Sequence, residues 1–481
     1  MPISLGIDIG TSAVKVALID EVGLLAEAQA PLTASHPQSG YSEQHPQIWI
    51  DATIKALGSL RAIAPTAFAS VDCIGFSGQM HGLVSLDAHH KPIRQAILWN
   101  DARASIEASD LQQAHPDLAE VAGVHCMASF IAPKLKWLAK HEPDNVAATR
   151  HILFPKDFVR HWMTGECATD PVDAAGSWLF DQQKGQWSEA LCQAIALDPD
   201  LLPPVKPSRD VAGVLSRSIA ASLGLKSGIP VITGAGDAAA GCLGLGMVNA
   251  GAAFISLGTS SQIFVTTAAY KPHIPSIIHT FAHALPHHWF QMAAMLNGAS
   301  ALQWWSDICA VNISELLQEA TNVLPSVDAP YFLPYLAGER TPHNNPSARG
   351  AFIGLDRSSG RADLTRAVLE GVAFSLADGL AALEHAGSEI QGLAFTGGGA
   401  KSLFWAQLIS TALNKPISCL QDAAIGPVIG AARLAAAHFN KGYEFTKPAI
   451  KKILCPAGSE KGLTANRLAH WRLLYSQAIS T

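Results

Sequence analysis

Ile7-Asp8-Ile9-Gly10-Thr11-Ser12 is an apolar strand that ends in a glycine-hydroxyl turn, and a second apolar strand follows over Val14 to Ile19. This pattern predicts a β-hairpin whose turn exposes backbone N–H groups. The stretch Ile255-Ser256-Leu257-Gly258-Thr259-Ser260, followed by Ile263 to Thr266, repeats the same pattern far downstream. A repeated strand-turn-strand unit indicates an internal duplication.

A second pair of similar segments supports the duplication. Ile74-Gly75-Phe76-Ser77-Gly78 and Leu393-Ala394-Phe395-Thr396-Gly397 are both apolar strands that end in a hydroxyl and a glycine. Length alone suggests about three domains, but the repeat predicts two larger ones of related architecture. We expect an N-terminal domain over residues 1–245 and a C-terminal domain over 246–481.

The remaining patterning predicts a mixed α/β protein. Period-two alternation predicts further strands at Leu24 to Ala28, Gly82 to Leu86, Val231 to Thr233 and Ser261 to Thr267. Apolar residues recurring at three and four predict helices at Pro46 to Arg61, Phe130 to Lys140, Gly298 to Ile308, Asp363 to Ala386 and Leu403 to Leu413. Asp363 is the expected N-cap of the long helix.

Composition excludes several classes of function. Hydrophobic residues make up 49% and charged residues 15%, so a disordered chain is excluded. The formal net charge of −6 offers no basic field for nucleic acid or an anionic membrane. The stretch 238–270 carries no charge, but its glycines and polar residues favour a helix and buried strands over a membrane span.

The cellular setting is inferred from the cysteines and the N-terminus. The 8 cysteines show no C-x-x-C pair and no zinc-like spacing, which indicates inert thiols in a reducing compartment. The N-terminus lacks a basic segment and meets an acid at Asp8, so no secretory signal is predicted. We expect a cytoplasmic protein.

The turns point to a nucleotide. Two glycine-hydroxyl hairpins facing each other across a cleft would offer N–H donors from both sides to a polyphosphate. The chain has no P-loop motif, and the dinucleotide glycine fingerprint is absent after the first strand. A third glycine run, Gly397-Gly398-Gly399, lies between a predicted strand and a predicted helix, where backbone can approach adenine and ribose closely.

Two carboxylates follow apolar strands. Asp8 has no counterpart in the second hairpin, where Ser256 stands, so a single Mg²⁺ ion is expected near Asp8. Asp237 is surrounded by small residues that leave room for a substrate, and it is the candidate base. Either residue alone could be an ordinary turn or helix cap. The histidines His279, His283, His287 and His288 lack a known ligand spacing, so a structural metal is not predicted there.

Longer motifs resemble a known family. They are Ser77-Gly78-Gln79-Met80-His81-Gly82, Ile97-Leu98-Trp99-Asn100-Asp101-Ala102-Arg103, Gly338-Glu339-Arg340-Thr341-Pro342-His343-Asn344-Asn345-Pro346 and Gly350-Ala351-Phe352-Ile353-Gly354-Leu355. Together with the hairpins, they are similar to the FGGY carbohydrate kinases of the actin and sugar-kinase superfamily. Among these, the members that phosphorylate xylulose are most similar. The resemblance runs from about Leu5 to Arg433.

The resemblance implies two RNase H-like (actin-like ATPase) domains with a cleft between them, in which ATP and sugar meet. Asp237 would be the catalytic base. The sugar would be bound by Met80, His81 and Asp237, and the metal ion by Asp8. The residues expected to line the nucleotide are Thr11, Ser12, Lys15, Thr259, Gly298, Gln303, Gly398 and Gly399. A homodimer is also implied.

The expected activity is therefore a xylulokinase activity, ATP-dependent phosphorylation of D-xylulose to D-xylulose 5-phosphate in pentose catabolism. The alternatives are another sugar or polyol kinase acting on ribulose, gluconate or glycerol, a non-catalytic actin-like ATPase, or a DNA-binding regulator. The net negative charge of the chain argues against a DNA-binding regulator. The Met80-His81 pair argues against a glycerol kinase. Two positions depart from the family: Ala238 stands where asparagine is usual, and Ile131 where a small polar residue or proline is usual.

Overall fold

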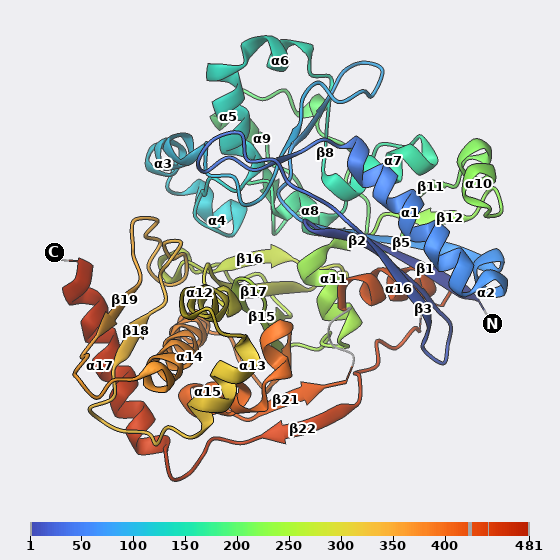
Figure 1. Ribbon diagram of the computed structural model, residues 1–481. Helices are drawn as coiled ribbons and strands as arrows, with labels where there is room; N and C mark the ends of the chain where they lie inside the picture. The colour runs from blue at the N-terminus through green and yellow to red at the C-terminus, as the bar shows by residue number, and fades with distance from the viewer. Residues whose placement is uncertain (1, 422–425, 441, 480–481) are drawn as a thin grey trace.

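The computed structural model describes residues 2–421, 426–440 and 442–479, and this part of the chain contains two seven-stranded sheets (Figure 1). In spatial order, the first sheet contains β11 (Val211–Val214), β12 (Pro230–Ile232), β5 (Val71–Gly78), β1 (Ile3–Ile9), β2 (Ala13–Ile19) and β3 (Leu24–Pro31), with β13 (Ala235–Gly236) beside β5. The second contains β16 (His279–Ala282), β17 (Trp289–Met295), β15 (Ser261–Thr267), β14 (Ala252–Leu257), β20 (Gly392–Thr396), β21 (Ile417–Leu420) and β22 (Ile450–Leu454).

Short strands and helices complete the two halves. The two-stranded sheets pair β4 (Glu43–Gln44) with β7 (Ala96–Ile97), β6 (Val84–Leu86) with β8 (His151–Leu153), β9 (Phe180–Asp181) with β10 (Gln186–Trp187), and β18 (Tyr331–Leu333) with β19 (Ala351–Ile353). The helices of the first half are α1 (Gln47–Ile63), α2 (Pro65–Ala69), α3 (Ser105–Ala114), α4 (Leu118–Ala122), α5 (Ile131–His141), α6 (Pro143–Ala148), α7 (Pro155–Thr164), α8 (Pro171–Ala175), α9 (Glu189–Ala194), α10 (Arg217–Leu223) and α11 (Asp237–Gly244). Those of the second half are α12 (Ala299–Cys309), α13 (Ile313–Thr321), α14 (Arg361–His385), α15 (Leu403–Leu413), α16 (Gly426–Phe439) and α17 (Lys461–Ile479), with the 3₁₀ segment η3 (Gly398–Lys401).

The two sheets share a five-strand core, which confirms the predicted duplication. The core runs β3-β2-β1-β5-β12 in the first sheet and β17-β15-β14-β20-β21 in the second. In each core the first three strands are antiparallel neighbours, and the last two lie parallel to the hairpin strand beside them. The two glycine-hydroxyl turns therefore occupy equivalent places, at the tips of β1–β2 and β14–β15.

Most predicted elements are confirmed with ends shifted by a few residues, and the strand Ser261–Thr267 and the helix Leu403–Leu413 begin and end as predicted. The prediction of Asp363 as the N-cap of α14 is wrong. The helix begins at Arg361, after Gly360, and the Asp363 carboxylate accepts a hydrogen bond from the Gly360 N–H at 2.9 Å. A carboxylate in the third helical position reaches back to the N-cap amide in this way.

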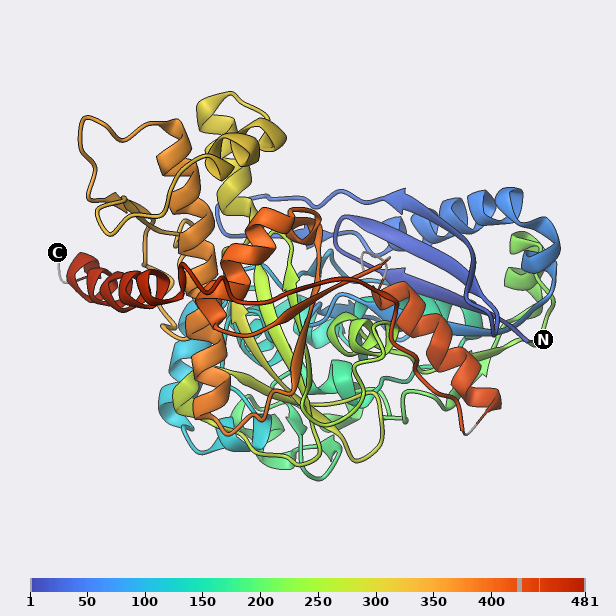
Figure 2. The same cartoon turned by 90° about the horizontal axis from the view of Figure 1, so that it is seen from below.

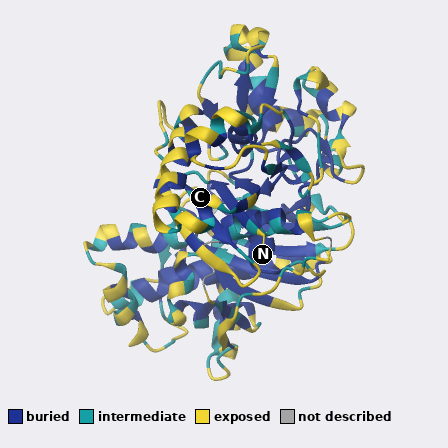
Figure 3. Ribbon diagram, turned by 90° about the vertical axis from the view of Figure 1, so that its right-hand side faces the viewer, coloured by how far each residue is buried: buried dark blue, intermediate teal, exposed yellow. Residues whose placement is uncertain are grey.

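The charge-free stretch 238–270 forms most of α11 together with β14 and β15. Alternate residues of β14 face different cores. Ala253 and Ile255 pack with α14, whereas Phe254 packs with buried residues of α8 and α11. Figure 3 shows buried strands inside the molecule and exposed faces on the outer helices. None of the described helices is long and apolar enough to cross a membrane.

Helix α16 belongs to the second half in sequence, but it packs on β1 and β5 of the first sheet (Figure 2). The contact is backbone against backbone. A Cβ added to Gly6 would lie 2.2 Å from the Val428 carbonyl oxygen, and one added to Gly75 would lie 2.0 Å from that of Ala431. Side chains at neighbouring strand positions point to the other face, where Leu5 and Ile7 pack in the core that α1 shares.

The same helix also packs closely against α11. A Cβ on Gly430 would lie 1.8 Å from the Ala240 carbonyl oxygen, and one on Gly244 would lie 2.0 Å from that of Gly426. Since α11 begins at Asp237, this glycine-dependent packing fixes the candidate base relative to both halves of the chain.

The variant Gly430→Ala should therefore lower the free energy of unfolding by about 3 kcal/mol or more, because its methyl group has no space and the backbones must separate. Urea unfolding followed by circular dichroism measures this. The matched control is Gly58→Ala, in the exposed middle of α1 with no atom within 4 Å of the added Cβ. The control should be stabilised by about 0.5–1 kcal/mol, and equal behaviour of the two variants would contradict the close packing.

Candidate active site

Asp237 and Asp8 meet at the ends of three neighbouring strands. Asp8 on β1 is in register with Ser77 on β5, and Ser77 is in register with Ala235 on β13. Asp237 follows one residue after β13, as the first residue of α11, and is half-buried. Burial, together with the nearby Asp8 carboxylate, raises the pKa of Asp237 to about 7. Asp237 is therefore a stronger base than an ordinary carboxylate.

The Asp8 carboxyl is buried, and its Oδ1 has no hydrogen-bond partner among the described residues. The buried Ser77 hydroxyl lies beside it, and its hydrogen bond to the Asp8 side chain favours the charged carboxylate. Burial raises the pKa of Asp8, and the positive charge of Lys15, its cross-strand partner on β2, opposes that rise. Carboxylate and hydroxyl oxygens are hard donors, and the Asp8 Oδ1 is buried without a partner, so these residues fit Mg²⁺.

Met80 lies against Gly236, the residue before Asp237, and His81 follows Met80 in the chain. Met80 is buried, and a Cβ added to Gly236 would lie 2.7 Å from its Cγ. The His81 Nδ1 is 2.7 Å from the Gly176 carbonyl oxygen, and burial lowers the pKa of this imidazole to about 3. A carbonyl only accepts, so Nδ1 carries the proton of the neutral ring. Nε2 is then left as an acceptor, suited to a hydroxyl group.

A buried lysine holds the His81 backbone, which has the left-handed φ of 66°. The Lys134 Nζ donates to the carbonyl oxygens of His81 at 2.8 Å and Ser129 at 2.7 Å. Burial lowers the pKa of Lys134 to about 7, with Asp101 opposing the shift. The sequence predicts a helix here but gives Lys134 no role, because nothing local distinguishes it from Lys136 and Lys140 of the same helix or indicates its carbonyl partners.

A buried ion network supports the elements on both sides of the site. The Lys156 Nζ lies 2.5 Å from Asp157, 2.6 Å from Asp170 and 3.0 Å from Asp173, and all four side chains are fully buried. Burial, the largest influence, would lower the pKa of Lys156, but the three carboxylates raise it above its usual value. Burial raises the pKa of Asp173 well above its usual range, so this carboxyl is the best placed to hold a proton.

The network reaches the site by two routes. Arg160 binds Asp157 at 2.7 Å and the Thr233 carbonyl oxygen at 2.5 Å, just before β13 and Asp237. Asp170 caps α8 by accepting from the Val172 N–H at 2.8 Å. Helix α8 ends at Ala175, and the carbonyl oxygen of its C-cap residue Gly176 binds His81.

The first turn keeps two backbone donors free. The Thr11 hydroxyl donates to Gln79 Oε1 at 3.1 Å and accepts from Trp99 Nε1 at 3.0 Å. The Gln44 side chain donates to the Thr11 carbonyl oxygen at 2.8 Å. Within the described residues, the N–H groups of Thr11 and Ser12 donate to no acceptor. Thr11 thus fixes the turn with its side chain, and Ser12 is exposed.

The turn of the second hairpin, Gly258 to Ser260, has the same arrangement as the first and lies against the N-terminus of α12. Thr259 is exposed, and the N–H groups of Thr259 and Ser260 donate to no acceptor among the described residues. The Gly298 and Ala299 N–H groups donate to the carbonyl oxygens of Thr259 at 3.0 Å and Gly258 at 2.7 Å. A Cβ on Gly298 would lie 2.5 Å from the Ser260 carbonyl oxygen, so glycine is required there.

The third glycine run is beside this turn. A Cβ on Gly399 would lie 2.4 Å from Leu257 Cδ2, whereas Gly398 is exposed with no atom within 4 Å of an added Cβ. The structure therefore brings Thr259, Gly298, Gly398 and Gly399 together. Gln303 lies one turn into α12, is exposed, and donates to Asp307 on the same helix at 2.8 Å.

Sequence reasoning missed the role of Arg340. This half-buried residue of the second half lies close enough to His81 and His279 for its charge to lower the pKa values of both imidazoles. Its guanidinium has no ion pair or hydrogen bond within the described part of the chain. The motif that contains Arg340 was visible in the sequence, but its proximity to His81 depends on the contact between the two halves.

Two family models match the sequence. The N-terminal domain model of the FGGY family of carbohydrate kinases matches residues 3–244, and its C-terminal domain model matches residues 253–439. The chain belongs to the FGGY family of carbohydrate kinases. The actin-like ATPase fold of this carbohydrate kinase agrees with the doubled five-strand core described above.

Individual relatives match nearly the whole length of this chain. A xylulose kinase of Escherichia coli (strain K12) is 41% identical, covering 90% of this chain and 89% of its own. The crystal structure of a xyloylose kinase from Brucella ovis is 40% identical with a TM-score of 0.95, covering 99% of both chains. That of a xylulose kinase from Rhodospirillum rubrum is 26% identical with a TM-score of 0.91, covering 99% and 98%.

Replacing the buried cation in Lys156→Met should lower the free energy of unfolding of this kinase by about 3–5 kcal/mol, because Asp157, Asp170 and Asp173 then lose their shared partner. Urea unfolding measures the loss. The control is Lys140→Met, because Lys140 is 64% exposed and lies 3.9 Å from Glu107. It should change the free energy by less than about 0.5 kcal/mol. A loss in Lys156→Met no larger than in the control would show that the network does not stabilise the fold.

Proposed function

We propose that this carbohydrate kinase transfers the γ-phosphoryl group of ATP to the terminal hydroxyl of D-xylulose, giving D-xylulose 5-phosphate and ADP. The observation that carries the proposal is the 41% identity to a xylulose kinase over 90% of the chain. Its support within the molecule is a carboxyl of raised pKa, Asp237, beside the Met80-His81 pair.

In this proposal Asp237 is the catalytic base and accepts the O5 proton as the oxygen attacks the γ-phosphorus. Phosphoryl transfer has a loose transition state, so alignment of the two substrates contributes more than proton removal. The packing of α11 against α16 supplies that alignment for Asp237. A base whose pKa lies near neutrality is deprotonated in a large fraction of molecules and still binds a proton well.

Met80, His81 and Asp237 form the sugar site. The neutral His81 ring offers Nε2 to a sugar hydroxyl, while Met80 covers Gly236 and limits the depth of the site. Arg340 brings a positive charge from the second half to the same place. Ala238, directly after the base, offers no side-chain hydrogen bond, so selectivity must come from these other groups.

The two glycine-hydroxyl turns bind the nucleotide in this proposal. The free N–H groups of Thr11 and Ser12 face the phosphates from one side and those of Thr259 and Ser260 from the other. Lys15 adds a cation near Asp8. Gly298 keeps the second turn on α12, Gly398 and Gly399 leave room for the nucleoside, and Gln303 reaches it from the exposed face of α12.

Asp8 would hold Mg²⁺, with the Ser77 hydroxyl next to it. The ion, when bound, neutralises charge on the phosphate oxygens. The chain's own contribution is a buried carboxylate whose Oδ1 has no partner among the described residues, with Lys15 and Asp237 as its charged neighbours.

The division of the chain belongs to the same proposal. Residues 1–245 carry the sugar and phosphate side, residues 246–481 carry the nucleotide side, and the two close on the substrates across a cleft. The location in the cytoplasm and the assembly into a homodimer remain predictions, which fractionation and light scattering test.

The substrate is tested by measuring ADP release over a panel of D-xylulose, D-ribulose, gluconate and glycerol at equal concentration. D-Xylulose should give the largest kcat/KM, and product analysis should place the phosphate on O5. A larger kcat/KM for another member of the panel would reassign the substrate within the family. ADP release independent of every sugar would identify an ATPase instead.

Asp237→Asn should lower kcat by about 10²- to 10⁴-fold, because the amide keeps the size of the side chain but cannot accept the proton. The KM for D-xylulose should change far less. The control is Asp110→Asn, at an exposed carboxylate on α3, which should keep the wild-type kcat. Near-normal turnover of a folded Asp237→Asn enzyme would refute the assignment of the base.

The pH profile gives an independent check. Because Asp237 must be deprotonated to accept the proton and its pKa is raised to about 7, kcat/KM should increase with pH up to about 7 and level off above it. Initial rates at saturating Mg·ATP and low D-xylulose measure this profile. A profile already level well below neutrality would mean that an ordinary carboxyl, or no carboxyl, controls the rate.

A further inference from the structure

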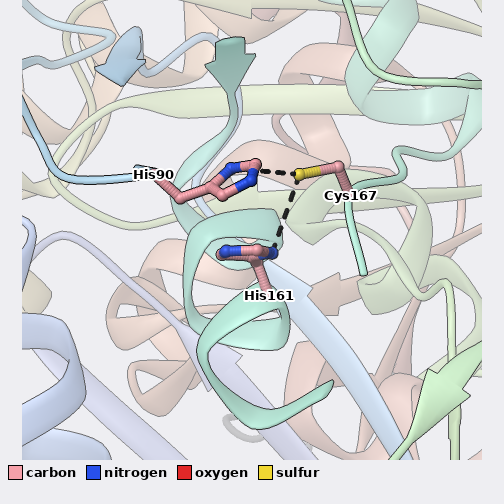
Figure 4. A group of neighbouring side chains, drawn as sticks. All are labelled: His90, His161 and Cys167. Carbon is pink, nitrogen blue, oxygen red and sulfur yellow. Dashed lines mark hydrogen bonds between the residues drawn. The ribbon is translucent and has the colours of Figure 1, made fainter. Parts of the chain in front are cut away.

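Two histidines and a cysteine that the proposed reaction does not use form a cluster on the first half (Figure 4). His90 lies in the turn after β6, His161 on α7, and Cys167 in the loop after α7. The Cys167 Sγ is 3.7 Å from the Nδ1 of His90 and 3.6 Å from the Nδ1 of His161. All three residues are half-buried, so the group is open to solvent on one side.

These spacings match those of a coordinated metal. A tetrahedral Zn²⁺ ion holds nitrogen at about 2.0–2.1 Å and sulfur at about 2.3 Å, which places a ligand nitrogen and a ligand sulfur about 3.6 Å apart. The three donor atoms of the cluster all lie within 4.8 Å of one another. The two sulfur–nitrogen distances, 3.7 and 3.6 Å, therefore already have the length that a shared ion needs.

Each donor is held by well-formed local structure. The turn that carries His90 is closed by Asp87, whose Oδ1 accepts from the N–H groups of His89 at 2.8 Å and Lys91 at 2.9 Å. This turn places His90 at a left-handed φ of 58°. At the end of α7, the Gly165 N–H bonds the His161 carbonyl oxygen at 2.7 Å. That bond starts the loop that carries Cys167.

A third histidine closes one side of the group. His151 begins β8, in register with Leu86 of β6, and its ring stacks on that of His90 with centroids 4.3 Å apart. Burial and the neighbouring His90 lower the pKa values of His151 and His161. Both imidazoles are therefore neutral at physiological pH, the state in which histidine binds metal. Burial raises the pKa of the Cys167 thiol, so metal binding there releases a proton.

We infer that His90, His161 and Cys167 bind a Zn²⁺ ion, with a water molecule as the fourth ligand. Imidazole and thiolate donors select borderline-soft ions such as Zn²⁺ over Mg²⁺, so this ion is distinct from the one that serves ATP. The bound ion joins the β6 turn to α7, the helix that carries Lys156 and Arg160 of the buried ion network. Its expected effect is on the stability of the first half.

The competing interpretation is a set of thiol-imidazole hydrogen bonds alone. The two interpretations predict different metal binding. Hydrogen bonds alone need no ion, and they leave Cys167 as a thiol. Another group of side chains, Asp157, Asp170 and Asp173, also has the spacing of metal ligands. The Lys156 ammonium already lies among its oxygens. That group carries no metal proposal.

The test titrates Zn²⁺ into the full-length, tag-free, chelator-treated protein by calorimetry, and then replaces Zn²⁺ with Co²⁺. We expect one ion per chain, a thiolate-to-cobalt charge-transfer band in the near ultraviolet, and a higher melting temperature with Zn²⁺. Cys167→Ser should abolish the band and weaken Zn²⁺ binding by more than about 100-fold, since the loss of a partner that only orients a ligand already costs about 10- to 100-fold.

Cys309→Ser is the matched control, because Cys309 is also half-buried but lies outside the cluster. It should keep the band and the affinity. If Cys167→Ser does not fold by circular dichroism, His161→Gln takes its place with the same expected loss. Absence of Zn²⁺ binding by the wild type, absence of the thiolate band, or equal losses in the variant and the control would overturn the proposal.

Discussion

The contact on which the rest of the structure depends is the backbone-to-backbone packing of α16 against α11 and the first sheet. Four glycines, Gly6, Gly75, Gly244 and Gly430, sit where any side chain would collide with main-chain atoms. Through this contact a helix from the second half becomes part of the first. Helix α11 is thereby held between the first sheet and a helix from the second half, and the candidate base at its start with it. Alignment of substrates within fractions of an ångström needs a support of this stiffness.

Around that support, two lysines that hold the backbone of the site are kept from water. Lys134 and Lys156 are fully buried, one bonded to carbonyl oxygens and the other to three carboxylates. Such arrangements cost desolvation energy, which their hydrogen bonds and ion pairs offset. What they provide is a fixed geometry around His81 and β13. The same low-polarity surroundings raise the pKa of Asp237, so the device that positions the base also tunes it.

Much of this could be predicted from local pattern. The two hairpins, the duplication and most of the helices follow from periodicity and turn residues, which act over a few positions. The error at Asp363 has the same origin, since an acidic residue near a helix start fits both the N-cap and the third position, and only the Gly360 backbone decides between them. Lys134, Lys156, Arg340 and the His90-His161-Cys167 group were not found, because their partners are distant in sequence.

The sequence by itself determined the class of the fold, the two glycine-hydroxyl turns and the short set of residues among which the candidate base was sought. These are properties of strands, turns and composition, and they are set by neighbours along the chain. The tertiary structure decided which groups meet: Asp8 with Asp237, Arg340 with His81, and α16 with the opposite half. Burial and through-space charge depend on chain segments folded together, so no single segment of sequence contains them.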